Sequence, residues 1–268
     1  MNFELDWRGI VAYKTLRVEK SDSITTIFLN RPSQRNALNG ELIGELRALT
    51  DELRGDASTR AVIVTGAGKA FSVGADVEML RRIGEVSAPD ETRAEISKWR
   101  DAFDAFEQLP QITIAAINGL AYGGGVVLAL ACDFRIASTH AIFGLPEIKL
   151  GMVLALGGTQ RLTRLIGVSA AKEMILRGRN VTAYDSQRIG LVHRIAEPNE
   201  LMGLARGWAE REMKYSPRAL ALAKDLINRS FDRAANASAE AETIAQVELL
   251  HSPDFLARLK AVKENGEI

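Results

Sequence analysis

The chain has 268 residues, with 34 lysines and arginines balanced by 34 aspartates and glutamates, so its formal net charge at pH 7 is zero. This balance gives no electrostatic reason to bind nucleic acid or an anionic membrane, and we expect neither partner. The length is enough to bury a sizeable core, either as one domain or as one domain with an appendage.

The chain also lacks the sequence signals of export and membrane insertion. Its first ten residues, MNFELDWRGI, contain acidic residues and no continuous apolar core, which argues against a signal peptide. No apolar run reaches the roughly 18–20 residues of a membrane span. The single cysteine, Cys132, lies in the apolar run LALAC and is predicted to pack in the core. We therefore expect a cytoplasmic protein.

Short β-branched runs alternate with helical patterns along the first 150 residues. Two apolar stripes at three- and four-residue steps predict amphipathic helices, one over residues 42–53 and one over residues 96–109. The alternation predicts an α/β fold with a largely parallel sheet. The predicted strands are Ile24–Asn30, Ala61–Thr65, Ile112–Ile117, Phe134–Ala137 and Ala141–Phe143.

After about residue 157 the pattern becomes helical. Thr182 and Asp185 have capping-box spacing, with aspartate in place of glutamate, and predict a helix start. We place a boundary so that residues 1–197 form the core with the ligand site and residues 198–268 form a helical region. Its predicted helices are Glu200–Met213, Pro217–Arg229 and Ser238–Leu250.

Three consecutive glycines, Gly123, Gly124 and Gly125, connect an apolar strand to an apolar helix. Such a run lets the backbone approach a ligand and directs free N–H groups toward it. Glu147 follows in the loop sequence GLPE. Backbone donors aimed at a carbonyl, with one carboxylate nearby, predict an oxyanion hole with a general base, and hence acyl-transfer or enolate chemistry.

The same segment resembles the enoyl-CoA hydratase/isomerase (crotonase) superfamily, whose marker reads approximately NGxAxGGGxxLAxxCD. Here it is NGLAYGGGVVLALACD, over residues 118–133. Similar stretches occur in the family's order along most of the chain. They are LNRP (29–32), RNAL (35–38), FSVGAD (71–76), FGLPE (143–147) and GGTQR (157–161).

The resemblance implies a crotonase-like spiral of β-β-α turns with a C-terminal helical region. It implies that this region builds trimer contacts and covers the ligand, so we expect a homotrimer or a hexamer made of two trimers. The substrate would be an acyl-CoA, with coenzyme A as part of the substrate and no separate cofactor. We predict no metal site, since the three histidines are scattered.

Residue by residue, the resemblance implies that the N–H groups of Ala75 and Gly124 hold the thioester oxygen and that Glu147 moves a proton. The substrate-binding positions would be completed by the backbone of Ala37 and Leu38 at the adenine and by Asp76, Val77 and Glu78 along the acyl-pantetheine channel.

Several of these positions have a second interpretation. Asp76 also fits the cap of a helix beginning at Val77. Arg31 and Arg35 fit either CoA phosphates or a solvated face. Where many family members have a C-terminal basic pair, this chain has Glu264 and Asn265, with only Lys260 and Lys263 nearby.

Val127 is the main departure from the family pattern, because hydratases with two glutamates have their other carboxylate there. Valine cannot transfer a proton, and shuttling one proton between C2 and C4 needs only a single base. Leu154 likewise replaces a common proline. We therefore favour enoyl-CoA double-bond isomerisation through an enolate.

Two alternatives stay open at this point. One is hydratase or lyase chemistry on a specialised acyl-CoA, such as an aromatic or cyclic one, with Tyr122, Asp76 or Glu78 as the second group. The other is an acyl-CoA-binding protein without catalysis.

Overall fold

The computed structural model describes residues 13–86, 88–231, 235–255 and 257. Its larger sheet has six strands in the order β1-β2-β3-β5-β7-β10, and all neighbours are parallel except the β1–β2 hairpin. The strands are β1 (Leu16–Ser21), β2 (Ile24–Leu29), β3 (Ala61–Gly66), β5 (Ile112–Ile117), β7 (Phe134–Ser138) and β10 (Arg194–Ala196).

A second sheet has the order β4-β6-β8-β9, in which only the β8–β9 pair is antiparallel. Each of the central strands β3, β5 and β7 continues into a short strand of this second sheet before the chain enters a helix. This repeat gives the predicted spiral of β-β-α turns and confirms the fold class. The short strands are β4 (Ala70–Ser72), β6 (Leu120–Tyr122), β8 (Ile142–Gly144) and β9 (Val181–Thr182).

The predicted helices form largely where the apolar stripes place them. All five stripe residues of α1, Leu42, Ile43, Leu46, Leu49 and Leu53, are buried. The helices are α1 (Gly40–Gly55), α2 (Val77–Val86), α3 (Pro89–Glu107), α4 (Gly124–Leu130), α5 (Gly158–Arg177), α6 (Ala183–Arg188), α7 (Leu201–Glu212), α8 (Pro217–Arg229) and α9 (Ala235–Leu250), with short 3₁₀ turns η1 (Pro32–Gln34) and η2 (Glu147–Leu150).

The second stripe differs from the prediction at both ends. Trp99, Phe103 and Phe106 are buried on α3, but Ile96 is 45% exposed. Leu109 is buried beyond the end of the helix. The stripe therefore marks only the part of α3 that lies against the core.

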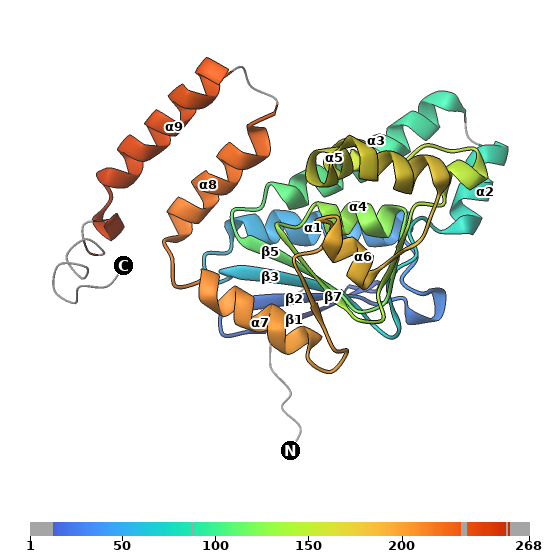
Figure 1. Ribbon diagram of the computed structural model, residues 1–268, viewed down its shortest axis with the longest axis horizontal. Coiled ribbons are helices and arrows are strands. Elements are labelled where there is room, and N and C mark those ends of the chain that lie inside the picture. Colours follow the sequence, from blue (N-terminus) through green and yellow to red (C-terminus); the bar gives the residue numbers. More distant parts are fainter. Residues whose placement is uncertain (1–12, 87, 232–234, 256, 258–268) are drawn as a thin grey trace.

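The two faces of the larger sheet are covered differently. Helices α1, α3 and α4 contribute to the main core on one side. On the other side, Leu201, Ala205 and Ala209 of α7 pack against β3, β5 and β7. Helices α8 and α9 extend away from the sheet (Figure 1). The division at residues 197 and 198 stays a prediction, with α7 packed on the sheet.

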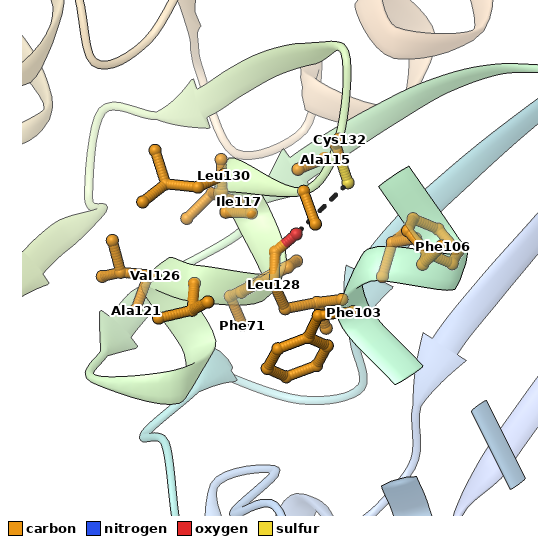
Figure 2. Packing of buried hydrophobic residues seen from close by; sticks show 14 of the residues in the cluster. Phe71, Phe103, Phe106, Ala115, Ile117, Ala121, Val126, Leu128, Leu130 and Cys132 are labelled. Carbon is orange, nitrogen blue, oxygen red and sulfur yellow. Dashed lines mark hydrogen bonds between the residues drawn. The ribbon is translucent and has the colours of Figure 1, made fainter. Parts of the chain in front are cut away.

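Cys132 lies in the main core, as predicted. Its thiol donates a hydrogen bond to the Leu128 carbonyl at 3.6 Å, among the apolar side chains shown in Figure 2. Burial raises the pKa of this thiol to about 12, so it stays protonated and unreactive near neutral pH.

Within the described part of the chain, no helix is both long and apolar enough to cross a membrane.

Candidate active site

Gly123 brings the glycine run and Glu147 together. It lies between β6 and α4 with a φ of +48°, a conformation that favours glycine. Its N–H donates to the Gly144 carbonyl at the end of β8. A Cβ atom on Gly123 would lie 2.4 Å from Glu147 Oε1, so any other residue here would force this carboxylate to move.

The loop after β4 approaches the same point from the other side. Gly74 has a φ of +83°, and a Cβ atom on it would lie 3.0 Å from the Gly124 nitrogen. A short parallel bridge joins Leu38 to Ala75 and uses the N–H groups of Leu38 and Asp76. The N–H of Ala75 is not part of this bridge.

The N–H groups of Ala75 and Gly124 therefore lie close together. A Cβ atom on Gly124 would lie 3.8 Å from the Ala75 nitrogen. Among the described residues, neither N–H donates to a protein acceptor. Two unpartnered donors, one of them at the start of a helix, match the geometry of an oxyanion hole.

Glu147 supplies the carboxylate of this site. It begins η2, and its own carbonyl accepts a hydrogen bond from the Met152 N–H at 2.9 Å. Its Oε2 is buried and has no hydrogen-bond partner in the described part of the chain. Burial raises the pKa of this carboxyl group above its usual value. A carboxylate with a free, partly desolvated oxygen is suited to exchange protons with a ligand.

Two of the three predicted channel residues lie beside this centre but line a separate cavity. Asp76 and Glu78 face a cavity of about 730 Å³ between the start of α1, α2 and α3, whereas Ala75, Gly124 and Glu147 do not line it. Asp76 Oδ1 accepts a hydrogen bond from the Glu78 N–H, which is the predicted cap of α2. Glu78 pairs with Arg81, and Val77 is 76% exposed.

The two arginines near the predicted adenine position differ in their contacts with the rest of the protein. Arg31 donates to the Ala37 carbonyl at 2.6 Å and pairs with Asp76 at 3.2 Å, so its guanidinium is used within the protein. Arg35 is exposed and in the left-handed region. The N–H groups of Ala37 and Leu38 donate to protein carbonyls. Their carbonyl oxygens each accept one protein hydrogen bond, from Arg31 and from the Asp76 N–H, so a ligand could use only the second lone pair of each oxygen.

Two polar residues that support the site were not singled out from the sequence. The Asn36 side chain is fully buried and bonds to the Arg31 N–H and to the carbonyls of Ala67 and Ala70. Ser72 Oγ donates to the Asn36 carbonyl. Both lie inside the quoted RNAL and FSVGAD stretches, and asparagine or serine buried in such loops is the signal that could have identified them.

Val127 lies in an apolar environment. A Cβ atom on Gly158 would lie 2.6 Å from Val127 Cγ2 and 2.9 Å from Leu154 Cγ, so these two buried side chains meet at Gly158. Tyr122, one candidate for a second group, accepts a hydrogen bond from the Asn180 side chain through its hydroxyl. Asp76 and Glu78, the others, are held by the arginine pairs described above.

The histidines give no metal site among the described residues, where no group of three or more His, Cys, Asp or Glu side chains could hold an ion. His193 packs edge-on against Phe134 and Trp208, and its Nδ1 accepts a hydrogen bond from the Arg135 N–H. Burial, with the nearby Arg135 charge, lowers its pKa to about 4. His193 is therefore a packing residue.

Comparison with known proteins agrees with this architecture. The enoyl-CoA hydratase/isomerase family model matches residues 19–267. The short-chain-enoyl-CoA hydratase of Clostridium acetobutylicum is 40% identical over 213 residues, which is 79% of this chain and 80% of the relative.

Solved structures give the same result. An enoyl-CoA hydratase from Bacillus anthracis superposes with a TM-score of 0.88 at 39% identity, covering 94% of this chain and 96% of that one. DspI of Pseudomonas aeruginosa gives a TM-score of 0.90 at 35% identity, covering 96% and 97%. The fold and the matches define a crotonase-type enzyme, and the chain belongs to the enoyl-CoA hydratase/isomerase family.

Proposed function

We propose that this enzyme moves the double bond of an enoyl-CoA through an enolate, with Glu147 as its single acid/base. The observation that carries the proposal is the unpartnered Glu147 Oε2, held against Gly123 beside the free N–H groups of Ala75 and Gly124. Donors and base are thus arranged around one small volume.

In this mechanism the thioester oxygen accepts hydrogen bonds from the Ala75 and Gly124 N–H groups. Glu147 removes a proton from C2 of a 3-enoyl-CoA, so the C2–H bond breaks and a dienolate forms whose negative charge the two donors stabilise. The protonated Glu147 then returns the proton to C4, which gives the 2-enoyl-CoA and restores the carboxylate. Removing one such donor typically costs about 2.7–4 kcal/mol of transition-state stabilisation.

The choice of isomerisation rests on Val127. Hydration needs a water molecule positioned at C3 as well as a proton delivered to C2, and the apolar contact of Val127 with Leu154 supports neither task. Isomerisation needs only one proton carrier.

Hydration is the second candidate, because the Clostridium and Bacillus relatives are named as enoyl-CoA hydratases. These names do not support a preference for isomerisation. A hydratase or lyase acting on an aromatic or cyclic acyl-CoA would need a second group, and a binding protein without turnover would leave the Glu147 carboxylate idle.

The deciding experiment assays purified enzyme on 3-enoyl-CoA for isomerisation and on 2-enoyl-CoA for hydration. We expect isomerisation to dominate and Glu147→Gln to lower its kcat by about 10²–10⁴-fold, the usual loss when a general acid/base is removed. Glu173→Gln, an exposed carboxylate on α5, is the matched control and should retain full activity. Hydration without isomerisation would overturn the reaction assignment, and undiminished Glu147→Gln activity would exclude Glu147 as the base.

We also propose that coenzyme A enters only as part of the substrate, without a separate cofactor, and that the enzyme is a cytoplasmic homotrimer or hexamer. Exposed apolar side chains on α8, just after it and on α9, among them Ile227 and Phe231, support an assembly. Lys260, Lys263, Glu264 and Asn265 lie outside the described residues.

A further inference from the structure

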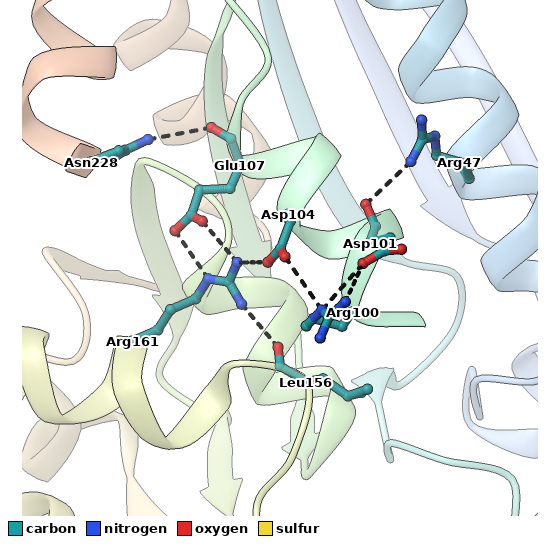
Figure 3. Close-up of polar contacts among 8 residues, drawn as sticks. All are labelled: Arg47, Arg100, Asp101, Asp104, Glu107, Leu156, Arg161 and Asn228. Atoms are coloured by element: carbon teal, nitrogen blue, oxygen red, sulfur yellow. Dashed lines mark hydrogen bonds and ion pairs between the residues drawn. The ribbon is translucent and has the colours of Figure 1, made fainter. Parts of the chain in front are cut away.

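Arg161, in the first turn of α5, joins two distant parts of the chain (Figure 3). Its side chain is 11% exposed. Its guanidinium donates to both carboxylate oxygens of Glu107, at 3.0 and 2.8 Å, and to Asp104 at 2.5 Å, both on α3. The remaining nitrogen donates to the Leu156 carbonyl at 2.9 Å. All three guanidinium nitrogens are therefore occupied.

The backbone that Arg161 binds has an unusual conformation. Leu156 has a φ of +59° and Gly157 a φ of +75°. A left-handed leucine is uncommon and persists only where its surroundings hold it. A Cβ atom on Gly157 would lie 2.5 Å from Arg161 Nη1, so the guanidinium lies directly on this turn.

The same turn ends the loop that follows the candidate base. The Met152 N–H binds the Glu147 carbonyl at one end of this loop, and Arg161 binds Leu156 at the other. Between them, buried Leu154 meets Val127 at Gly158. Val127 lies one helical turn after Gly123, and its N–H donates to the carbonyl of Gly123, the glycine that lies against the Glu147 carboxylate. The position of Leu154 thus depends on how the end of the loop is held.

We infer that Arg161 is a positioning residue that clamps the 151–157 loop onto α3 and so keeps the surroundings of Glu147 apolar and ordered. This inference rests on the proposed role of Glu147. The flat fork of arginine suits simultaneous bonding to two carboxylates and a carbonyl, which a lysine ammonium reproduces only in part.

The test compares Arg161→Gln and Arg161→Lys with the wild type on the 3-enoyl-CoA substrate across pH. For Arg161→Gln we expect kcat to fall by about 10- to 100-fold, because small misplacements of a catalytic group are costly. KM should change by less than about threefold, since the donors that hold the thioester are untouched. Water reaching Glu147 should lower the pKa of its carboxyl group and so shift the acid limb of the kcat profile to lower pH. For Arg161→Lys, both kcat and the position of the acid limb should lie between those of the wild type and Arg161→Gln.

Arg177→Gln is the matched control, because Arg177 is also on α5 but is exposed and paired only locally with Glu173. It should leave kcat and the pH profile unchanged. Circular dichroism and active-enzyme titration correct each rate for the folded fraction. If Arg161→Gln does not fold, Glu107→Gln is used in its place, because it weakens the Arg161–Glu107 hydrogen bonds from the α3 side.

A folded Arg161→Gln enzyme with wild-type kcat and an unshifted acid limb would overturn the inference, as would a loss explained entirely by a smaller folded fraction. Glu147→Gln, assayed in parallel, separates this failure from a failure of the proposed function. Full activity of Glu147→Gln would exclude Glu147 as the base and so overturn the proposed function. An inactive Glu147→Gln together with an unaffected Arg161→Gln would overturn only the positioning role of Arg161.

Discussion

At the scale of single residues, two glycines with positive φ let the candidate oxyanion donors and base converge. Gly74 lets the β4 loop approach Gly124, and Gly123 lets the Glu147 carboxylate lie against the backbone. Each is glycine for two reasons, the backbone conformation and the absence of a side chain. A substitution at either position should therefore affect stability and activity together.

Gly123→Ala tests this coupling. With φ +48° and ψ −118°, Gly123 lies outside the left-handed helical region that L-residues reach at modest cost, and the new methyl group must displace Glu147 Oε1. We expect a loss of about 1–3 kcal/mol in the free energy of unfolding and at least a tenfold drop in kcat/KM. Urea denaturation and steady-state kinetics measure the two effects.

Gly207→Ala is the control, because Gly207 lies on α7 with nothing within 4 Å of an added Cβ atom. It should stabilise the protein by about 0.5–1 kcal/mol, the usual gain at a helical glycine. Wild-type kcat/KM in Gly123→Ala would show that the Glu147 carboxylate does not depend on this glycine.

At the scale of elements, a buried ion pair attaches α8 to the core. Lys224 Nζ lies 2.7 Å from Asp133 Oδ2 and donates to the Gln111 carbonyl at 3.0 Å, with its side chain 6% exposed. Asp133 also accepts two hydrogen bonds from Thr113 at the start of β5. One carboxylate thus connects a core strand, the end of α4 and a C-terminal helix.

Lys224→Met should break this connection. Removing one member of a buried pair leaves an uncompensated charge, and we expect a loss of about 3 kcal/mol in the free energy of unfolding. Adding Asp133→Asn should recover part of it, since the unpaired charge is then gone. Arg229→Met removes an exposed pair from the same helix and should cost less than about 0.5 kcal/mol. Equal losses in the Lys224 and Arg229 variants would contradict a stabilising role for the buried Lys224–Asp133 pair.

At the scale of the whole molecule, α8 and α9 extend from the sheet and expose apolar side chains that a monomer leaves in water (Figure 1). These side chains are Ile227, Phe231, Ile244, Val247 and Leu250. Burial of such a surface between copies of the chain would stabilise an assembly.

We therefore expect light scattering to report three or six times the 29.2 kDa chain mass. An Ile227→Asp/Phe231→Asp variant should shift the mass toward the monomer, because a buried charge opposes association. Ile96→Asp, on the exposed side of α3, is the control and should leave the mass unchanged. A wild-type monomer at micromolar concentration would contradict the proposed assembly.

The sequence by itself determined the features that depend on local rules. Hydrophobic period predicted the strands and the stripe of α1, and capping-box spacing predicted the start of α6 at Thr182, because burial and capping act within one or two turns. The glycine run and Glu147 were singled out as one site, since their conformational freedom and chemistry are properties of the residues themselves. Family resemblance ordered these pieces into one fold.

Only the tertiary structure decided which charged side chains form ion pairs within the protein. Arg31 is bound to Asp76, and Arg161 reaches Asp104, which lies 57 positions earlier in the chain. No periodicity encodes such pairs, because they exist only after distant elements pack and remove the groups from water. The same packing made Ile96 an exposed residue, placed Val127 against Leu154, and gave the candidate base Glu147 a buried oxygen without a partner.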